Sequence, residues 1–266
     1  MALDGYATIK MPLVLVGLGL TFCLWLSSIP SARAQESVYI FAAASTIGAV
    51  NEATSIFIKQ KKVMVVPVFA SSGALARQLF AGAPGHLFLS ANKKWMAWAQ
   101  SQGTIIKETR RVLLRNRLVV AMHKGRNLNS LEFKKDNFIS IVGNGRLAIG
   151  DPSHAPIGIY ARAALRWMGV WKQLGPQALR LADAAQARSL VEYGEATFGI
   201  LYESDVVTSS RLKVAKLFPA IAHMPITYEI ALTRAGAGHP LALKLLNWLT
   251  GTEAALVFAK HGFRVD

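Results

Sequence analysis

Two short segments of the chain each carry an apolar strand into a serine at the expected start of a helix. They are Phe41–Thr46 (FAAAST) and Phe69–Gly73 (FASSG), with Ser45 and Ser72 at the turns. The two serines are separated by the length of one strand–helix–strand unit, so both strands should end at the same edge of a parallel sheet. Helix N-termini at that edge present unsatisfied N–H groups and a partial positive charge, which hold anions. The pair therefore predicts an anion site that needs no lysine or arginine.

The first 34 residues are expected to be a secretory signal peptide. Met11–Ile29 is almost wholly apolar, and Ala32–Ala34 forms an A-x-A cleavage site before Gln35. The apolar run is long enough for a membrane anchor, but the cleavage site favours removal after Ala34 and a periplasmic mature chain. The chain's one cysteine, Cys23, lies in this segment and lacks the small preceding residues of a lipoprotein signal. The mature chain therefore has no cysteine for disulfides or metal sites.

Basic residues outnumber acidic ones. The whole chain has 30 Lys and Arg against 15 Asp and Glu, and removal of Asp4, Lys10 and Arg33 with the signal peptide leaves a net charge of +14. The basic residues are scattered through expected helices and turns, without an RNA-binding aromatic motif or a single basic stripe. We expect a solvated surface that attracts small anions, and no nucleic-acid partner. The six histidines show no clustered spacing, so no metal bound by protein ligands is expected.

The mature chain alternates strands with helices, which is typical of an α/β protein. A first set of elements covers Val38–Gln102, and a second set begins after a basic turn at Arg115–Arg117. The length and this pattern favour two domains. The expected strands are Val38–Ala43, Val63–Ala70, Leu87–Ser90, Leu118–Met122, Arg146–Ile149, Thr197–Leu201 and Thr227–Thr233, and the expected helices are Thr46–Lys59, Ala74–Ala81, Lys93–Gln102, Gly158–Met168, Ala184–Tyr193 and one or two within His239–Lys260.

Several longer motifs resemble the periplasmic molybdate-binding proteins of ABC importers. In order, they are FAAAST, VFASSGALARQLFAGAPGHLFLSANKKWM, GRLAIGDPSHAPIGIYARAAL, LVEYGEATFGILYESD and FAKHGFRV, spread from about Val38 to Val265. The resemblance implies a type II periplasmic-binding-protein fold, in which two α/β lobes bury a tetrahedral oxyanion in the cleft between them. It places lobe 1 at residues 35–116 and 229–266 and lobe 2 at residues 117–228. The crossings between lobes are implied near Arg117–Met122 and Ile226–Ala231.

Carried over by position, the ligand contacts of that family fall on Ser45, Ser72, Ile157, Ala184 and Tyr202. The resemblance implies hydroxyl and backbone N–H donors from the two serines, backbone N–H donors from Ile157 and Ala184, and a phenolic O–H from Tyr202. Ile157 stands where the family usually has a small residue, so its side chain is expected to affect the shape or the closure of the pocket. Ala184 stands where the family more often has valine, which is a minor change.

Each of these residues also has a purely structural interpretation. A serine at a helix start is commonly an N-cap, and a buried tyrosine commonly satisfies a backbone partner. His154, in the GDPSHAP loop near the expected cleft, is expected to support the ligand contacts from behind, to order that loop or to lie at the surface. Glu229 lies in the second implied crossing, where the family commonly has a different residue.

The resemblance implies a receptor without catalytic activity or cofactor. It would bind molybdate or tungstate and deliver the ion to the membrane permease subunits of an ABC transporter, and we expect it to be a monomer. A receptor of the same fold for sulfate, phosphate or a small organic carboxylate stays open because of Ile157. A secreted serine hydrolase is the alternative from another class of function, although the chain shows no G-x-S-x-G elbow and no evident histidine and acid partner for either serine.

Overall fold

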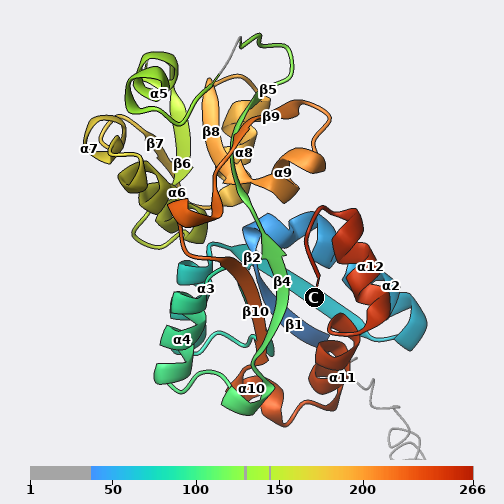
Figure 1. The fold of residues 1–266 in the computed structure, drawn as a ribbon. Helices are drawn as coiled ribbons and strands as arrows, with labels where there is room; N and C mark the ends of the chain where they lie inside the picture. Colours follow the sequence, from blue (N-terminus) through green and yellow to red (C-terminus); the bar gives the residue numbers. More distant parts are fainter. Residues whose placement is uncertain (1–36, 129–130, 144, 266) are drawn as a thin grey trace, which may run out of the picture. The chain divides into compact units, whose positions relative to one another are not determined.

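The computed structural model describes residues 37–128, 131–143 and 145–265, which form two α/β lobes, each built on a five-stranded sheet (Figure 1). Residues 36–266 belong to one compact unit, so contacts between the two lobes lie within that unit. The expected signal peptide at residues 1–34 lies outside the described residues. Among the described residues, no single helix is long and apolar enough to cross a membrane, and the pair α11 (Pro240–Leu249) and α12 (Thr252–Lys260), which passes that test only together, is bent by 59°.

The first sheet has the strand order β2-β1-β3-β10-β4. Its strands are β1 (Ser37–Ala43), β2 (Met64–Ala70), β3 (Leu87–Ser90), β4 (Arg111–Asn116) and β10 (Ile226–Leu232). β1 is parallel to β2 and β3, whereas β10 is antiparallel to β3 and β4. Because β1, β2 and β3 are parallel, the turns after these three strands meet at one edge of the sheet. This edge carries both serine-bearing segments.

Helices cover both faces of the first sheet (Figure 1). They are η2 (Ala44–Thr46), α2 (Ile47–Lys61), α3 (Ser72–Phe80), α4 (Lys93–Ser101), η3 (Lys107–Thr109), α10 (Arg234–Ala237), α11 and α12. Successive residues of β1 face opposite sides: Ile40 packs in the core with residues of α2, α11 and α12, and Phe41 packs with residues of α3 and α4. Burial on both faces explains why these strands are continuous apolar runs in the sequence.

The second sheet has the strand order β7-β6-β8-β5-β9. Its strands are β5 (Leu118–His123), β6 (Leu147–Gly150), β7 (Leu179–Leu181), β8 (Phe198–Tyr202) and β9 (Leu212–Leu217), and its helices are α5 (Lys135–Val142), α6 (Pro156–Trp167), α7 (Trp171–Leu174), α8 (Ala184–Glu192), α9 (Glu203–Val207) and η4 (Ala220–Ala222). β6 is parallel to β7 and β8, and β5 is antiparallel to β8. The parallel strands again bring the starts of their helices, α6, α8 and α9, to one edge.

Two segments join the sheets. β4 passes through Arg117 directly into β5, and residues 218–225 lead from β9 back to β10 (Figure 1). The residues expected at the crossings therefore lie inside regular strands: β5 pairs with β8 from Leu118, and β10 pairs with β4 from Ile226. The lobe boundary expected between residues 228 and 229 falls inside β10.

Candidate anion-binding site

A small cavity lies between the two lobes, where several helices begin. Its volume is about 10 Å³, far below the roughly 300–1,000 Å³ of pockets that take drug-sized ligands. Its lining residues are Ala43, Ala44, Ser45, Ser71, Ser72, Ala91, Pro156, Ile157, Asp183, Ala184 and Tyr202. All five residues singled out in the sequence thus line one cavity. A ligand held there must therefore be small.

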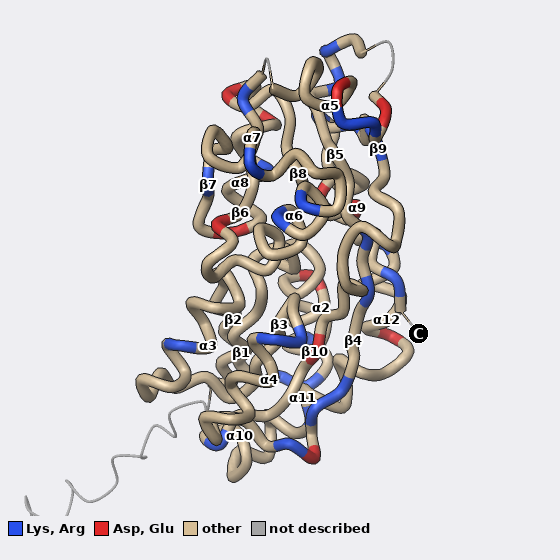
Figure 2. Tube along the Cα trace, turned by 60° about the vertical axis from the view of Figure 1, so that its left-hand side comes forward, with Lys and Arg blue, Asp and Glu red and all other residues tan. Residues whose placement is uncertain are grey.

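The cavity wall contains no basic side chain among the described residues. Lysine and arginine are instead distributed along the elements of both lobes (Figure 2). The one charged residue of the wall, Asp183, is the N-cap of α8, and its side chain accepts the N–H of Gln186 at 3.0 Å. The net positive charge of the chain therefore attracts anions from a distance, while the donors that line the cavity are uncharged.

Ser72 is arranged as a hydroxyl donor. It is the first residue of α3, and the helix is capped by the preceding Ser71, whose Oγ accepts the N–H of Ala74 at 3.3 Å. The Oγ of Ser72 accepts the N–H of Ala91 at 3.0 Å, in the turn after β3. Capping is thus performed by the neighbouring serine, Ser71, and not by Ser72. The Ser72 hydroxyl proton stays available to a ligand.

The start of α6 supplies a backbone donor. Pro156 is the first residue of this helix and has no N–H, so the first N–H of α6 is that of Ile157. The next two N–H groups, of Gly158 and Ile159, both reach the carbonyl oxygen of Ala155 at 3.0 and 3.1 Å. An unsatisfied N–H at a helix start is the kind of donor that holds an anion.

The isoleucine side chain at position 157 is accommodated by a glycine. Ile157 is 1% exposed, and its Cγ2 lies 2.4 Å from the place where a Cβ on Gly150 would stand. Because Gly150 has no side chain, β6 leaves room for the larger residue within the lobe. The departure from the small residue of the resembling family is therefore matched by local packing in lobe 2.

Tyr202 contributes a hydroxyl with no partner. It ends β8, is 1% exposed, and its Oη has no hydrogen bond among the described residues. Burial raises the pKa of Tyr202 well above its ordinary value, so the phenol keeps its proton and can donate. An unpaired buried hydroxyl costs on the order of 1–3 kcal/mol, which a bound acceptor would recover.

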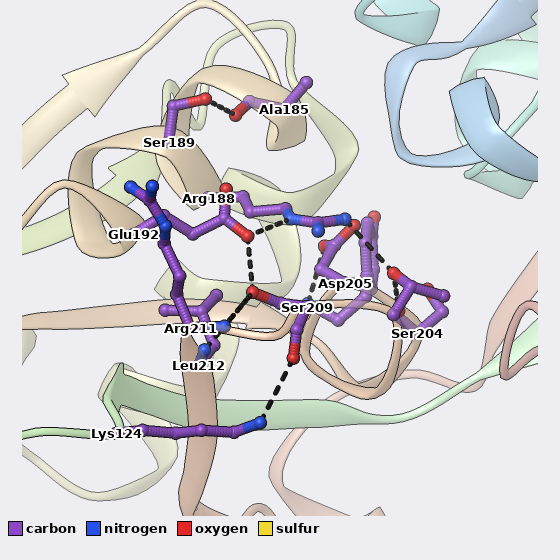
Figure 3. A network of polar contacts seen from close by, with 12 residues as sticks. Lys124, Ala185, Arg188, Ser189, Glu192, Ser204, Asp205, Ser209, Arg211 and Leu212 are labelled. Carbon is purple, nitrogen blue, oxygen red and sulfur yellow. Dashed lines mark hydrogen bonds and ion pairs between the residues drawn. The ribbon is translucent and has the colours of Figure 1, made fainter.

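A polar network fixes the segment around Tyr202 in lobe 2 (Figure 3). The N–H of Tyr202 donates to Asp205 at 3.2 Å, and Arg188 of α8 donates to Glu192 at 2.9 Å and to Thr208 of the turn after α9 at 3.1 Å. Burial raises the pKa of Asp205 to about 7, against the opposing charge of Arg188. The network ties α8 to α9 and so holds the starts of both helices at the cavity.

The lobes touch at the rim of the cavity. His154 Nδ1 lies 2.9 Å from Ser71 Oγ, and Tyr160 Oη donates to the carbonyl oxygen of Ala91 at 3.4 Å. Both contacts join lobe 2 to lobe 1, so the cavity is covered on this side. His154 is half-buried, and its ring contacts the other lobe.

Two α/β lobes that meet over a cavity of helix starts and neutral hydroxyls define a solute-binding receptor for a small anion. Over residues 38–264 the chain matches the family model of bacterial extracellular solute-binding proteins. It is 41% identical to the molybdate-binding protein ModA of Escherichia coli K12 over 88% of this chain and 92% of that protein. It is 34% identical to that of Haemophilus influenzae over 96% of each chain. The chain belongs to the bacterial extracellular solute-binding proteins, and within them to the ModA family.

Solved structures show the same fold. The periplasmic molybdate-binding protein of Azotobacter vinelandii has a TM-score of 0.75 at 22% identity, with 86% of this chain and 99% of that one covered. The sulfate-binding protein SubI of Mycobacterium tuberculosis has a TM-score of 0.72 at 13% identity, with 86% of each chain covered. The two scores are close, so the fold alone does not distinguish receptors for different oxyanions. The choice of ligand must come from the site and from the closer relatives.

The alternative of a serine hydrolase has no support in the contacts. The Oγ of Ser72 is engaged by a backbone N–H, and Ser45 contacts a tyrosine hydroxyl at 2.9 Å. Ser71 does contact His154, but its Oγ also caps α3, and no carboxylate among the described residues hydrogen-bonds that histidine. The family to which the chain belongs consists of receptors, not enzymes. Among the described residues, no group of three or more His, Cys, Asp or Glu is placed to hold a metal ion.

Proposed function

We propose that this protein is an extracytoplasmic receptor that binds molybdate in the interlobe cavity and delivers it to the permease of an ABC transporter. The five proposed contacts are the hydroxyls of Ser45, Ser72 and Tyr202 and the backbone N–H groups of Ile157 and Ala184. The observation that carries the proposal is the buried hydroxyl of Tyr202, which has no hydrogen-bond partner among the described residues and belongs to a residue of the cavity wall.

A wall made of donors selects for the charge state of the ligand. A fully ionised tetrahedral dianion offers only acceptors, so it can satisfy every donor at once. A protonated oxyanion brings an O–H that needs an acceptor, and the one carboxylate in the wall, Asp183, already accepts the N–H of Gln186 as the cap of α8. Neutral donors also avoid a buried unpaired charge when the cavity is empty.

The choice among fully ionised dianions then depends on cavity size. Molybdate has longer metal–oxygen bonds than the sulfur–oxygen bonds of sulfate, so a rigid cavity suits one and not the other. The ModA proteins of Escherichia coli and Haemophilus influenzae, named as molybdate-binding, support molybdate. Tungstate is nearly the same size as molybdate, and we propose that it binds as well.

The proposal also covers the export of the protein, its location and the movement of its lobes. We propose that residues 1–34 are removed after Ala34, and that the mature chain acts in the periplasm as a monomer. We propose that lobe 1 comprises residues 35–116 and 226–266 and lobe 2 residues 117–225, which moves the expected boundary between residues 228 and 229 to the start of β10. Rotation of the lobes about the two crossings would open the cavity, and the closed form would be the one that the permease recognises.

Titration of the purified, ligand-stripped protein tests the proposed function. Isothermal calorimetry with molybdate should show tight one-to-one binding, tungstate should bind similarly, and sulfate should bind much more weakly. Phosphate at neutral pH, which carries a proton, serves as the matched control for a donor-only wall. Binding of sulfate in the micromolar range or tighter, with no response to molybdate, would overturn the assignment.

A further inference from the structure

We propose that Asn116 and Tyr228, neither of which lines the cavity, position the Ser45 hydroxyl as a donor to the bound anion. The inference rests on the proposed function and adds two positioning residues to it. Asn116 ends β4, just before the first crossing, and Tyr228 lies in β10, just after the second. Asn116 and Ile226 are partners in the register of the two strands, which brings Tyr228 next to Asn116.

The orientation of the Asn116 amide is fixed by backbone donors. Its Oδ1 accepts the N–H of Arg117 at 2.9 Å and the N–H of Ser204 at 3.4 Å. The oxygen must therefore face these two groups, and Nδ2 must face the other way. Nδ2 lies 2.8 Å from the Oγ of Ser204 and 3.4 Å from the Oη of Tyr228. Since an amide nitrogen only donates, Tyr228 is the acceptor in its contact with Asn116.

The Tyr228 phenol also contacts the Ser45 hydroxyl. Tyr228 is completely buried, and its Oη lies 2.9 Å from the Oγ of Ser45. Because Asn116 already donates to that oxygen, we assign the phenol as the donor in its contact with Ser45. Burial raises the pKa of Tyr228 above its ordinary value, so the proton is held at physiological pH.

The Ser45 hydroxyl can then donate a hydrogen bond to the bound anion. In this assignment its Oγ accepts the hydrogen bond from Tyr228, and Ser45 lines the cavity. The direction of donation therefore runs from the Asn116 amide to Tyr228, from Tyr228 to Ser45, and from Ser45 to the anion. Hydrogen bonds in such a chain polarise one another, which strengthens the last donor. Ser204 at the start of α9 shares the Asn116 amide, so the chain of contacts also includes lobe 2.

The substitution Tyr228→Phe tests the inference because it keeps the ring and removes the donor. Without the phenol, the Ser45 hydroxyl loses its fixed orientation, and molybdate affinity should fall roughly tenfold or more. In a Ser45→Ala background, the same substitution should have little further effect, because the residue it positions is gone. Calorimetry on the four proteins of this cycle measures the coupling, and thermal unfolding without ligand checks that each is folded.

Tyr202→Phe is the matched control, since it also removes one buried tyrosine hydroxyl. We assign Tyr202 a direct contact, so its loss should weaken binding equally with serine or alanine at position 45. The positioning role would be overturned if Tyr228→Phe lowered molybdate affinity equally with serine or alanine at position 45, or if that variant bound molybdate as the wild type does. Either result would leave the receptor function standing. Failure of the wild-type protein to bind molybdate would instead overturn the proposed function.

Discussion

Replacing Ser45 and Ser72 together by alanine should abolish molybdate binding and leave the fold intact. Each serine hydroxyl is an uncharged donor to a charged ligand, and such a bond contributes about 1.5–3 kcal/mol. Loss of both should therefore weaken binding by roughly a hundredfold to ten-thousandfold. Calorimetry measures the affinity, and circular dichroism with thermal unfolding measures the fold.

The matched control for this pair is Ser189→Ala. Ser189 is a half-buried serine of α8 whose hydroxyl donates to the carbonyl oxygen of Ala185 at 3.0 Å, and it does not line the cavity (Figure 3). This variant should bind molybdate as the wild type does. Unchanged affinity in the double variant would place the site elsewhere in the protein.

Replacing Gly73 by alanine should weaken molybdate binding by obstructing closure of the lobes. A Cβ at this position would lie 2.5 Å from the carbonyl oxygen of His154, which belongs to lobe 2, and 2.7 Å from the ring of Trp95. Backbone at such a distance cannot be displaced cheaply, so the two lobes must separate or the loop before α6 must move. Overpacking of this kind costs about 1–3 kcal/mol, which corresponds to roughly a ten- to hundredfold loss of affinity.

Gly238→Ala provides the comparison for Gly73. A Cβ at Gly238 would meet no atom within 4 Å, and its φ of −89° suits any residue. Its affinity should equal that of the wild type. Small-angle X-ray scattering with molybdate should show a more open Gly73→Ala protein. Wild-type affinity and a wild-type scattering profile for that variant would show that the close approach at His154 is not required for binding.

Much of the fold could be predicted from the sequence because most strands are buried on both faces. β1, β3 and β8 are continuous apolar runs, and their expected bounds differ from the observed ones by one residue or less at each end. The strands that the sequence reading missed, β4, β7 and β9, all lie at sheet edges. An edge strand such as Arg111–Asn116 mixes exposed basic residues with buried leucines, so the sequence reading wrongly took its end at Arg115 for a turn.

The residues of the cavity could be named from the sequence, but their contacts could not. The serine-bearing strand ends indicated one wall through the geometry of parallel strands, and the opposite wall followed only from a family resemblance. Which of two adjacent serines caps α3 depends on backbone geometry, which the FASSG motif does not reveal. The contact of Asn116 with Tyr228 joins residues far apart in the chain, and no local pattern signals it. Glu229 also departs from the family, and its partner Arg110, at 2.7 Å, is equally remote.

The central claim is that a tetrahedral oxyanion occupies the cavity of neutral donors, and anomalous X-ray scattering tests it most directly. Crystals grown with molybdate, measured at the molybdenum absorption edge, should show one strong anomalous peak between the lobes. The oxygens around that peak should lie within hydrogen-bonding distance of the Ser45, Ser72 and Tyr202 hydroxyls and of the Ile157 and Ala184 N–H groups. A peak outside this cavity, beside surface lysines or arginines, would contradict the account.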